Sequence, residues 1–389
     1  MANSVAAAYP FIEVFVDTKA LRPAAQRSPG VIAVAGVSAA GDAGANAPMA
    51  CDTLADAVTH FGPSSALTTS LALAFLQDPA PSKVFGVKMA AASDADIVAA
   101  LDSLNALDDV DFVSLAGIVD SALLLRLKEH AEQASASGHK RIGVAMIDPA
   151  RPKVPTYVTE ALNSVHPSAG GGSDLLSSVS RMVMIAARGA TLADGKTPAD
   201  AATAAMAAIA GHAPSTSLVL KQLRGLSIPL QAQYTSAEIK GLSEANIIPI
   251  IQPSMIVGGG FYLGEGRCFT SDASMLYIDI VRVLDDIDFR LRAGLIGLVG
   301  DARITRGGLT TVRSAVQGIL GPLQRAAVID GFDVQIPLLD TLAIPESARN
   351  ATDTNLITTA RANRIVDMLV SITYGPAVHR LHVTLQPKF

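Results

Sequence analysis

Hydrophobic and polar positions divide the first 250 residues into alternating strands and helices. Short apolar runs bounded by glycine, proline or polar residues are typical of strands, and apolar positions three or four residues apart are typical of helices. Strands that alternate with helices at this spacing indicate an α/β layer with a largely parallel sheet. The predicted strands are 30–38, 84–89, 111–118, 141–147 and 181–187, and the predicted helices are 53–61, 65–76, 95–107, 121–136, 156–165, 199–211 and 235–245.

Beyond residue 245 the pattern is mixed, which predicts an α+β arrangement in the C-terminal part. Residues 246–251 form an apolar strand pattern that Pro249 interrupts, and we expect an edge strand because proline cannot donate to a ladder. The glycines at 258–260 separate two short apolar runs, which predicts a hairpin or bend. Further predicted elements are a helix at 309–323, a strand at 328–337 and a helix at 355–369.

Residues 274–300 are predicted to be a strand that runs into an amphipathic helix. The run from Met275 to Val283 is β-branched and apolar, as in a covered strand. The helical positions that follow are Leu284, Ile287, Leu291, Leu295 and Leu298, with Asp285, Asp286 and Asp288 in the first turns. Aspartates there would suit the positive end of the helix dipole. This segment is expected to frame a packed C-terminal domain.

Both ends of the chain carry strand patterns. Near the N-terminus, Ile12, Val14 and Val16 alternate with Glu13 and Asp17, while Phe11 and Phe15 lie on the polar side. Near the C-terminus, Leu381, Val383 and Leu385 alternate with Arg380, His382, Thr384 and Gln386. A loose connector rather than a tight hairpin turn follows the first strand. Such strands need partners elsewhere in the chain or in a neighbouring subunit.

Composition narrows the class of protein. Of the 389 residues, 50% are hydrophobic and 17% charged, with a mean hydropathy of +0.37. The most apolar stretch, residues 199–213, contains Asp200 and His212 and is too short for a membrane helix. So many apolar residues could be buried either in an enlarged core or in large contacts between subunits. Only 4% of the residues are aromatic and none is tryptophan, so the core is not unusually heavy and subunit contacts are favoured. The net charge of −5 disfavours nucleic-acid binding, and the N-terminus lacks a secretory pattern, which favours the cytoplasm.

No set of residues predicts catalysis, a cofactor or a metal site. Cys51 and Cys268 could pair, bridge subunits or remain free, and free thiols are favoured. His379 and His382 would face opposite sides of a strand. The acidic groups 108–111 and 285–288 do not converge at their spacings, so solvated or interfacial charges are the better interpretation. The glycine-containing segment 39–44 lacks phosphate-loop spacing, which favours an ordinary surface loop.

Three groups of segments together resemble a known family. The first is Gly30-Val-Ile-Ala-Val-Ala-Gly36, the helix ending at His60-Phe61-Gly62 and the strand 84–89; the second is 242–250 with Gly258–Arg267; the third is Tyr277–Val299 with the strands after it. They resemble the contractile tail sheath proteins of phages and related contractile injection particles, including R-type bacteriocins. The family's tryptophan is absent from Leu263-Gly-Glu-Gly-Arg267, and the middle of the chain, about 93–230, matches weakly.

The resemblance implies a multi-domain architecture with extended terminal arms. The expected parts are an arm at 1–22, an α/β domain at 23–268 with an outer inserted lobe at about 93–230, an inner sheath domain at 269–378 and an arm at 379–389. The arm strands would complete sheets in neighbouring subunits through Phe11, Ile12, Val14, Phe15, Val16, Leu381, Val383 and Leu385. Stacked hexameric rings would then surround a tail tube and contract to drive it through a host envelope without ATP.

The resemblance also implies the partners. They are further copies of the chain, the tail tube protein, and the baseplate and tail terminator proteins, in a virion tail assembled in the host cytoplasm, with neither nucleic-acid binding nor membrane insertion. Arg303, Arg306 and Arg313 are the candidate tube contacts. An α/β enzyme with an unrecognised active site and a non-contractile tube or shell protein are the alternatives. Tubes or ring stacks in electron micrographs would favour the sheath, and a stable monomer with a small-ligand pocket would favour the enzyme.

Overall fold

The computed structural model describes residues 30–167, 173–376 and 379. They divide into two compact units. The larger unit has the described residues of Arg27–Phe289, Pro322–Asp333 and Val370–Phe389, and the smaller has Arg290–Gly321 and Val334–Leu369. The predicted strands at 11–17 and 380–386 lie outside the described residues, as does His382.

A nine-stranded sheet forms the centre of the larger unit, in the order β2-β3-β1-β4-β5-β6-β10-β11-β8. The six strands from β3 to β10 in this order are parallel, while β2, β11 and β8 each pair antiparallel with a neighbour. The predicted α/β class with a largely parallel sheet is therefore confirmed. The strands are β1 (Val31–Val37), β2 (Pro48–Cys51), β3 (Lys83–Met89), β4 (Phe112–Leu115), β5 (Ile142–Met146), β6 (Met182–Ala186), β8 (Gln222–Leu223), β10 (Ile247–Ile251) and β11 (Phe261–Leu263). A separate pair consists of β7 (Thr191–Leu192) and β9 (Leu226–Ser227).

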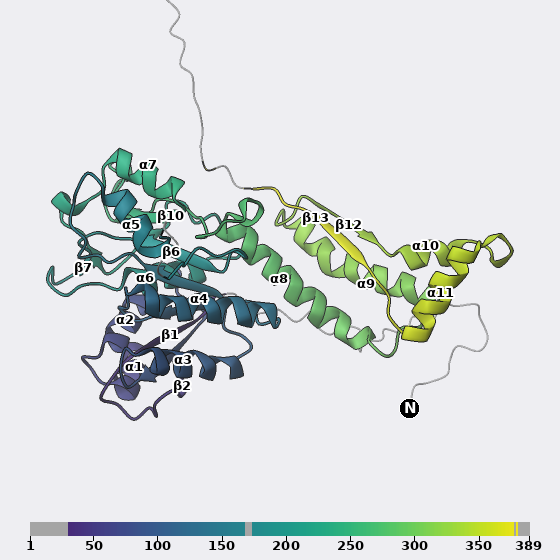
Figure 1. Ribbon diagram of the computed structural model, residues 1–389, viewed down its shortest axis with the longest axis horizontal. Helices are drawn as coiled ribbons and strands as arrows, with labels where there is room; N and C mark the ends of the chain where they lie inside the picture. Colours follow the sequence, from purple (N-terminus) through teal and green to yellow (C-terminus); the bar gives the residue numbers. More distant parts are fainter. Residues whose placement is uncertain (1–29, 168–172, 377–378, 380–389) are drawn as a thin grey trace, which may run out of the picture. The chain divides into compact units, whose positions relative to one another are not determined.

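Helices cover both faces of the sheet (Figure 1). One face carries α1 (Leu54–Phe61), α2 (Ala66–Phe75) and α6 (Ala201–Gly211), and the other carries α3 (Asp94–Ser103), α4 (Ser121–Ala136), α5 (Tyr157–Val165) and α7 (Ser236–Glu244). Strand β1 contributes side chains to the cores on both faces of the sheet. Ile32 and Val34 lie in the core under α1, α2 and α6, and Val31, Ala33 and Ala35 lie in the core on the other face. From β1 the chain moves to β3 in one direction and then to β4, β5 and β6 in the other. Right-handed crossovers therefore place α1 and α2 on one face and α3, α4 and α5 on the other. Helix α6, in the long connection from β6 to β10, returns to the first face.

Helix α6 has no polar face. Every residue from Ala201 to Ala210 is buried, and the helix packs against β1, β4, β5 and β6 as well as α2. Alanine side chains allow this close approach on all sides. Many of the apolar residues of the sequence are thus buried in a large core within the chain. The composition had favoured subunit contacts over such a core.

Strand β10 is not the edge strand that Pro249 predicted. It lies between β6, with Pro249 opposite Ala186, and β11. The ladder with β11 has its last paired residue at Ile250, and the Gly264 amide donates to the Pro249 carbonyl at 2.9 Å. Since opposed residues exchange two such bonds, the proline removes a single donor at the end of this ladder. A proline is therefore tolerated inside the sheet.

The smaller unit is helical. It contains the C-terminal end of α8 (Ile278–Leu295), most of α9 (Arg306–Arg325), α10 (Pro337–Ala343) and α11 (Ala351–Asn363). Its core consists of Leu309, Ile336, Leu338, Leu339 and Ile357. The end of α8 packs tightly on α9, because a Cβ atom at Gly294 would lie 2.5 Å from Cδ1 of Ile319. The described residues contain no helix long and apolar enough to cross a membrane.

Two further predictions for the C-terminal part were wrong. Residues 278–283 begin α8 rather than form a strand. This end of the helix is buried on nearly all sides, and a short apolar run does not distinguish a buried helix from a strand. Asp285 therefore lies inside α8 rather than in its first turns. The helix predicted at 355–369 ends at Asn363, since Arg364 takes the left-handed conformation (φ 58°), and strand β13 (Leu369–Thr373) follows.

Acidification should destabilise the larger unit through His130. Its side chain is 7% exposed, and Nε2 lies 2.9 Å from the Arg141 Nη1 donor. Burial, aided by the Arg141 charge, lowers the pKa of His130 from 6.5 to about 4. The unfolded chain then binds a proton that the folded chain does not, so stability falls as the pH drops from about 6.5 toward 4. Between pH 7 and pH 5 we expect a loss of about 2 kcal/mol, measured from urea unfolding.

The matched control for this prediction is His130→Gln, which removes the titrating group and leaves Glu238 in place. Burial tends to raise the pKa of Glu238, but hydrogen bonds from Arg188 and Thr235 lower it to about 2, so its contribution is lost only below pH 4.5. The variant should show a much flatter profile from pH 7 to pH 5. An equal loss in both proteins would contradict the role of His130.

Candidate assembly surface

Arg282 fastens the beginning of α8 to the end of α6. Its side chain is 6% exposed; Nη1 donates to the Ile209 carbonyl at 3.0 Å and Nη2 to the His212 carbonyl at 2.8 Å. Carbonyls at a helix C-terminus have no intrahelical donor, so the guanidinium caps α6. Burial lowers the pKa of Arg282 to about 10 although four aspartates oppose the shift, and the side chain stays charged at neutral pH.

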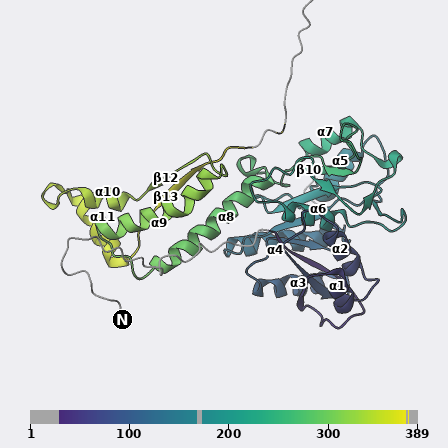
Figure 2. The same ribbon diagram turned by 180° about the vertical axis from the view of Figure 1, so that it is seen from behind.

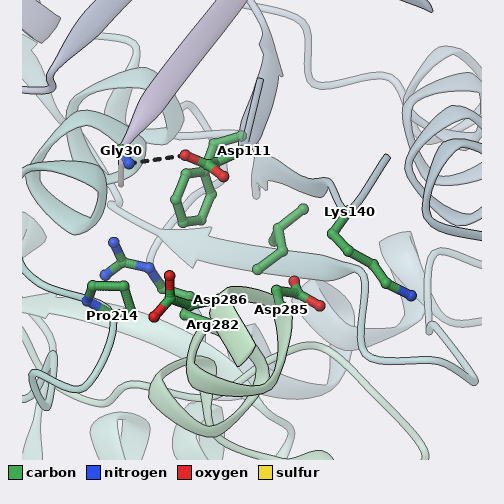
Figure 3. Close-up of a pocket in the computed structure, with 9 residues that line it drawn as sticks. Gly30, Asp111, Lys140, Pro214, Arg282, Asp285 and Asp286 are labelled. Carbon is green, nitrogen blue, oxygen red and sulfur yellow. Dashed lines mark hydrogen bonds between the residues drawn. The ribbon is translucent and has the colours of Figure 1, made fainter. Parts of the chain in front are cut away.

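An ion pair also joins α8 to the sheet. Arg181, just before β6, donates from Nη2 to Oδ1 of Asp285 at 2.9 Å and from Nη1 to Oδ2 at 2.5 Å, a bidentate pair with both side chains largely buried. Figure 3 shows Arg282, Asp285 and Asp286 of α8 facing a small cavity beside Asp111 and Gly30. This cavity lies at the amino ends of β1 and β4, whereas ligands of parallel α/β sheets bind at the carboxyl ends. We assign it to the joint between helix and sheet.

The acidic groups singled out in the sequence have separate partners. Asp111 accepts from the amides of Gly30 and Val31 at 2.8 and 3.0 Å, which ties the beginning of β1 to β4. Asp109 lies 3.1 Å from Lys83, and Asp108 lies 3.2 Å from His139. Within the described residues, no three His, Cys, Asp or Glu side chains gather as a metal site would require. These carboxylates therefore have structural roles.

A groove at the carboxyl ends of β4, β5 and β6 is where an enzyme of this topology would bind its substrate. Its buried acid is Asp200. That carboxylate accepts hydrogen bonds from Ser70 Oγ (2.6 Å), Thr203 Oγ1 (2.7 Å), the Thr203 amide (3.0 Å) and the Gly117 amide (3.2 Å). An acid held by four donors caps α6 and is poorly suited to accept a substrate proton. The groove thus gives the enzyme alternative little support.

The segment after β1 also lacks phosphate-loop geometry. It leads into β2, which pairs antiparallel with β3, rather than into a helix. Asp42 in this segment lies 2.7 Å from Nδ1 of His60 at the end of α1. This matches the surface loop that its spacing predicted.

Cys51 and Cys268 are both free and buried. Burial raises the pKa of Cys51 to about 11 and also raises the pKa of Cys268, so neither is a reactive thiolate at neutral pH. No disulfide joins them within the chain, which agrees with the free thiols favoured from the sequence. A bridge between subunits would require one of these thiols to become exposed.

Strands β12 (Gly331–Gln335) and β13 form a two-stranded sheet (Figures 1 and 2). The Asp330 amide donates to the Thr373 carbonyl at 2.8 Å, which places the beginning of β12 beside the end of β13. In β13, Val370 and Ile372 are half-buried while Leu369, Ser371 and Thr373 are exposed. An isolated two-stranded sheet is only marginally stable in water, so further strands at its outer edges would stabilise it.

The three arginines singled out in the sequence lie at the beginning of α9. Arg303 precedes the helix and is exposed, as is Arg306 in its first turn, and Arg313 is half-buried two turns later. Arg306 and Arg313 are seven residues apart and therefore share a face. Leu309, three residues after Arg306 and four before Arg313, lies beside them on the helix and belongs to the core of the smaller unit.

Solved structures of sheath proteins match almost the whole chain. A chain of the anti-feeding prophage baseplate, determined with sixfold symmetry, aligns with a TM-score of 0.65 and 13% identity over 99% of this chain and 100% of that one. A chain of an extracellular contractile injection system sheath complex in the contracted state aligns with a TM-score of 0.66 and 12% identity over 98% of each chain. The chain has the sheath-protein fold.

A third structure of this fold is the sheath tail protein of Desulfitobacterium hafniense, with a TM-score of 0.60 and 12% identity over 84% of this chain and 93% of that one. No protein-family model matches the sequence, and no curated protein matches it. The sheath architecture expected from the sequence is confirmed at the level of the fold.

Replacement of Arg282 should destabilise the sheath fold. Arg282→Met removes the donor to the His212 carbonyl and leaves the Ile209 carbonyl only the long bond from the His212 amide at 3.3 Å, and we expect a loss of about 3 kcal/mol in the free energy of unfolding. Arg282→Lys keeps the charge but cannot reach both carbonyls with a planar fork, so its loss should be intermediate. Arg224→Met, which alters an exposed ion pair with Asp78, should cost less than about 1 kcal/mol. Urea unfolding that ranks Arg224→Met equal to Arg282→Met would contradict the capping role.

Proposed function

We propose that the chain is the structural subunit of a contractile tail sheath. Subunits polymerise as stacked hexameric rings around a tail tube, and contraction drives the tube through the host envelope. The observation that carries this proposal is the sheath fold over nearly the full length of the chain and of its structural neighbours. The neighbours come from a sixfold-symmetric baseplate and from a contracted sheath complex, which supports ring stacking and contraction in this chain.

Strand addition provides the proposed connection between subunits. The sheet of β12 and β13 belongs to the proposed inner domain, residues 269–378, and has an outer edge on each strand. The strands predicted at 11–17 and 380–386 have the alternation that such an edge accepts. Main-chain hydrogen bonds would supply the affinity, and the apolar side chains of the arms would set the register, since a slip of one residue reverses the exposed and buried faces.

Contraction by this route needs no enzyme activity and no nucleotide. The free energy would be stored in the extended lattice and released as the subunits repack, while the strand connections keep neighbours joined. The buried carboxylate of the carboxyl-end groove caps a helix, which agrees with a structural role. The tail tube, the baseplate and the tail terminator are the proposed partners, and the assembled virion tail is the proposed location.

Removal of either arm should abolish assembly and preserve the fold. Full-length protein should form tubes or ring stacks in electron micrographs, while deletions of residues 1–18 and of residues 380–389 should yield monomers. The arms are proposed to pair with neighbouring subunits, so their removal should leave the core of the subunit intact and thermal unfolding should shift little. Unfolding of the truncated chains would instead indicate that the arms pair within their own subunit. A full-length chain that stays monomeric and binds a small ligand would overturn the sheath function.

The tail tube is proposed to contact the exposed arginines around the beginning of α9. Residues 290–321 contain five arginines, at 290, 292, 303, 306 and 313, and one acidic residue, Asp301. The whole chain has a net charge of −5, so this basic segment contrasts with the rest of the protein. An acidic tube surface is the complementary partner, because opposite potentials guide and orient association.

Neutralisation of these arginines should weaken tube binding selectively. The triple variant Arg303→Gln, Arg306→Gln, Arg313→Gln should bind the cognate tube about tenfold more weakly, since exposed ion pairs contribute up to about 1 kcal/mol each. Co-sedimentation with tubes at increasing salt measures this loss, and the variant should also show a shallower salt dependence. A matched triple variant at Arg224, Arg361 and Arg364 should bind normally. Equal loss in both variants would place the tube contact elsewhere.

A further inference from the structure

The segment after β13 is attached to the larger unit at two points. At the first, the hydroxyl of Tyr374 donates to Oδ2 of Asp279 at 2.8 Å. Asp279 lies in the first turn of α8 and is 3% exposed, so this carboxylate is fixed in the core. Burial raises the pKa of Tyr374, and the hydrogen bond to the Asp279 carboxylate raises it further, so the phenol remains a donor.

The second attachment is His379. Its Nε2 lies 3.0 Å from Oγ of Ser217, and its ring packs edge-to-face on Tyr277, with 4.9 Å between centroids and an interplanar angle of 81°. The Arg267 guanidinium lies 5.7 Å from the same tyrosine ring. Tyr277 directly precedes α8, so both attachments hold the segment beside the same end of that helix. A polar contact and an aromatic contact at one histidine specify its position more closely than either alone.

We propose that Tyr374 and His379 form a clasp that fixes where the C-terminal arm leaves the subunit. The inference rests on the proposed sheath function, in which that arm pairs with a neighbouring subunit. His379 immediately precedes the predicted strand 380–386, so the arm would begin its reach at the clasp rather than at the end of β13. The two clasp residues would be positioning residues for strand exchange between subunits.

The clasp shortens the free part of the arm. From His379, the ten residues 380–389 would span about 35 Å when fully extended. From Thr373, the end of β13, sixteen residues would be free and could span about 55 Å. The effective concentration of a tethered partner falls roughly as the −3/2 power of tether length. Lengthening the tether from ten to sixteen residues should therefore lower the effective concentration of the arm at its neighbour about twofold. A longer tether would also let the arm reach more than one neighbour.

The test compares clasp variants with matched controls in the full-length chain. His379→Ala and Ser217→Ala remove the second attachment from its two sides, and Tyr374→Phe removes the hydroxyl of the first. His166→Ala, at a half-exposed histidine that pairs with Asp174, and Tyr262→Phe, which loses a hydroxyl contact to the Gly259 carbonyl, are the controls. Hydrogen exchange in unassembled protein reports on the clasp itself. Critical concentration and tube geometry, measured by sedimentation and electron microscopy, report on assembly.

The clasp predicts that exchange in residues 374–379 rises about tenfold in His379→Ala and Ser217→Ala, equivalent to about 1.4 kcal/mol. The critical concentration should rise at least about twofold, and tube diameters should become heterogeneous. The controls should match the wild type in each measurement. Unchanged exchange, or increased exchange with unchanged assembly, would overturn the clasp while wild-type tubes uphold the sheath function. Absence of tubes from the wild type would overturn both.

Discussion

The guanidinium of Arg282 is the contact on which the larger unit depends most. It reaches the last carbonyls of α6, a helix that packs on four strands, and it belongs to α8, which continues into the smaller unit. An apolar side chain of similar length could fill the same volume, but it could not supply donors to carbonyls 70 and 73 residues earlier in the chain. Hydrophobic burial makes the core compact, and this one charged contact determines which end of α6 faces the beginning of α8.

Other buried arginines of the larger unit also bind carbonyl or carboxylate groups at the ends of strands and helices. Arg188 is 3% exposed, pairs with Glu238 at 2.6 Å and stacks against the rings of Tyr157 and Tyr234. Arg141 is fully buried and donates to the Leu104 carbonyl at 2.6 Å. Each guanidinium meets carbonyls or carboxylates where strands and helices end, because those are the places where backbone groups lack partners. A chain with few charges thus places several of them where loops meet the core.

The sequence predicts regular structure well where one pattern dominates, and poorly where a distant contact decides. The helix 121–136 has the predicted bounds because a capping aspartate, Asp120, begins it and its periodicity is uninterrupted. The first turn of α8 was mistaken for a strand, since its helical state depends on packing against distant segments. Arg364 ends α11 in a conformation that usually calls for glycine. Of the candidate contacts, Arg303, Arg306 and Arg313 were visible as a basic cluster, whereas Arg282 and the clasp were not, because their partners are remote in sequence.

The buried helix α6 has a consequence for the timing of assembly. Because this helix has no polar face, it would promote aggregation in any state that exposed it to water. Helix α2 and the sheet must therefore cover it as the larger unit folds. Each copy therefore encloses this apolar helix before it meets a neighbour. Newly made copies can therefore accumulate without aggregating through this helix. In the proposed assembly, their later joining would depend on backbone hydrogen bonds at strand edges, and a misplaced copy could detach before further copies were added.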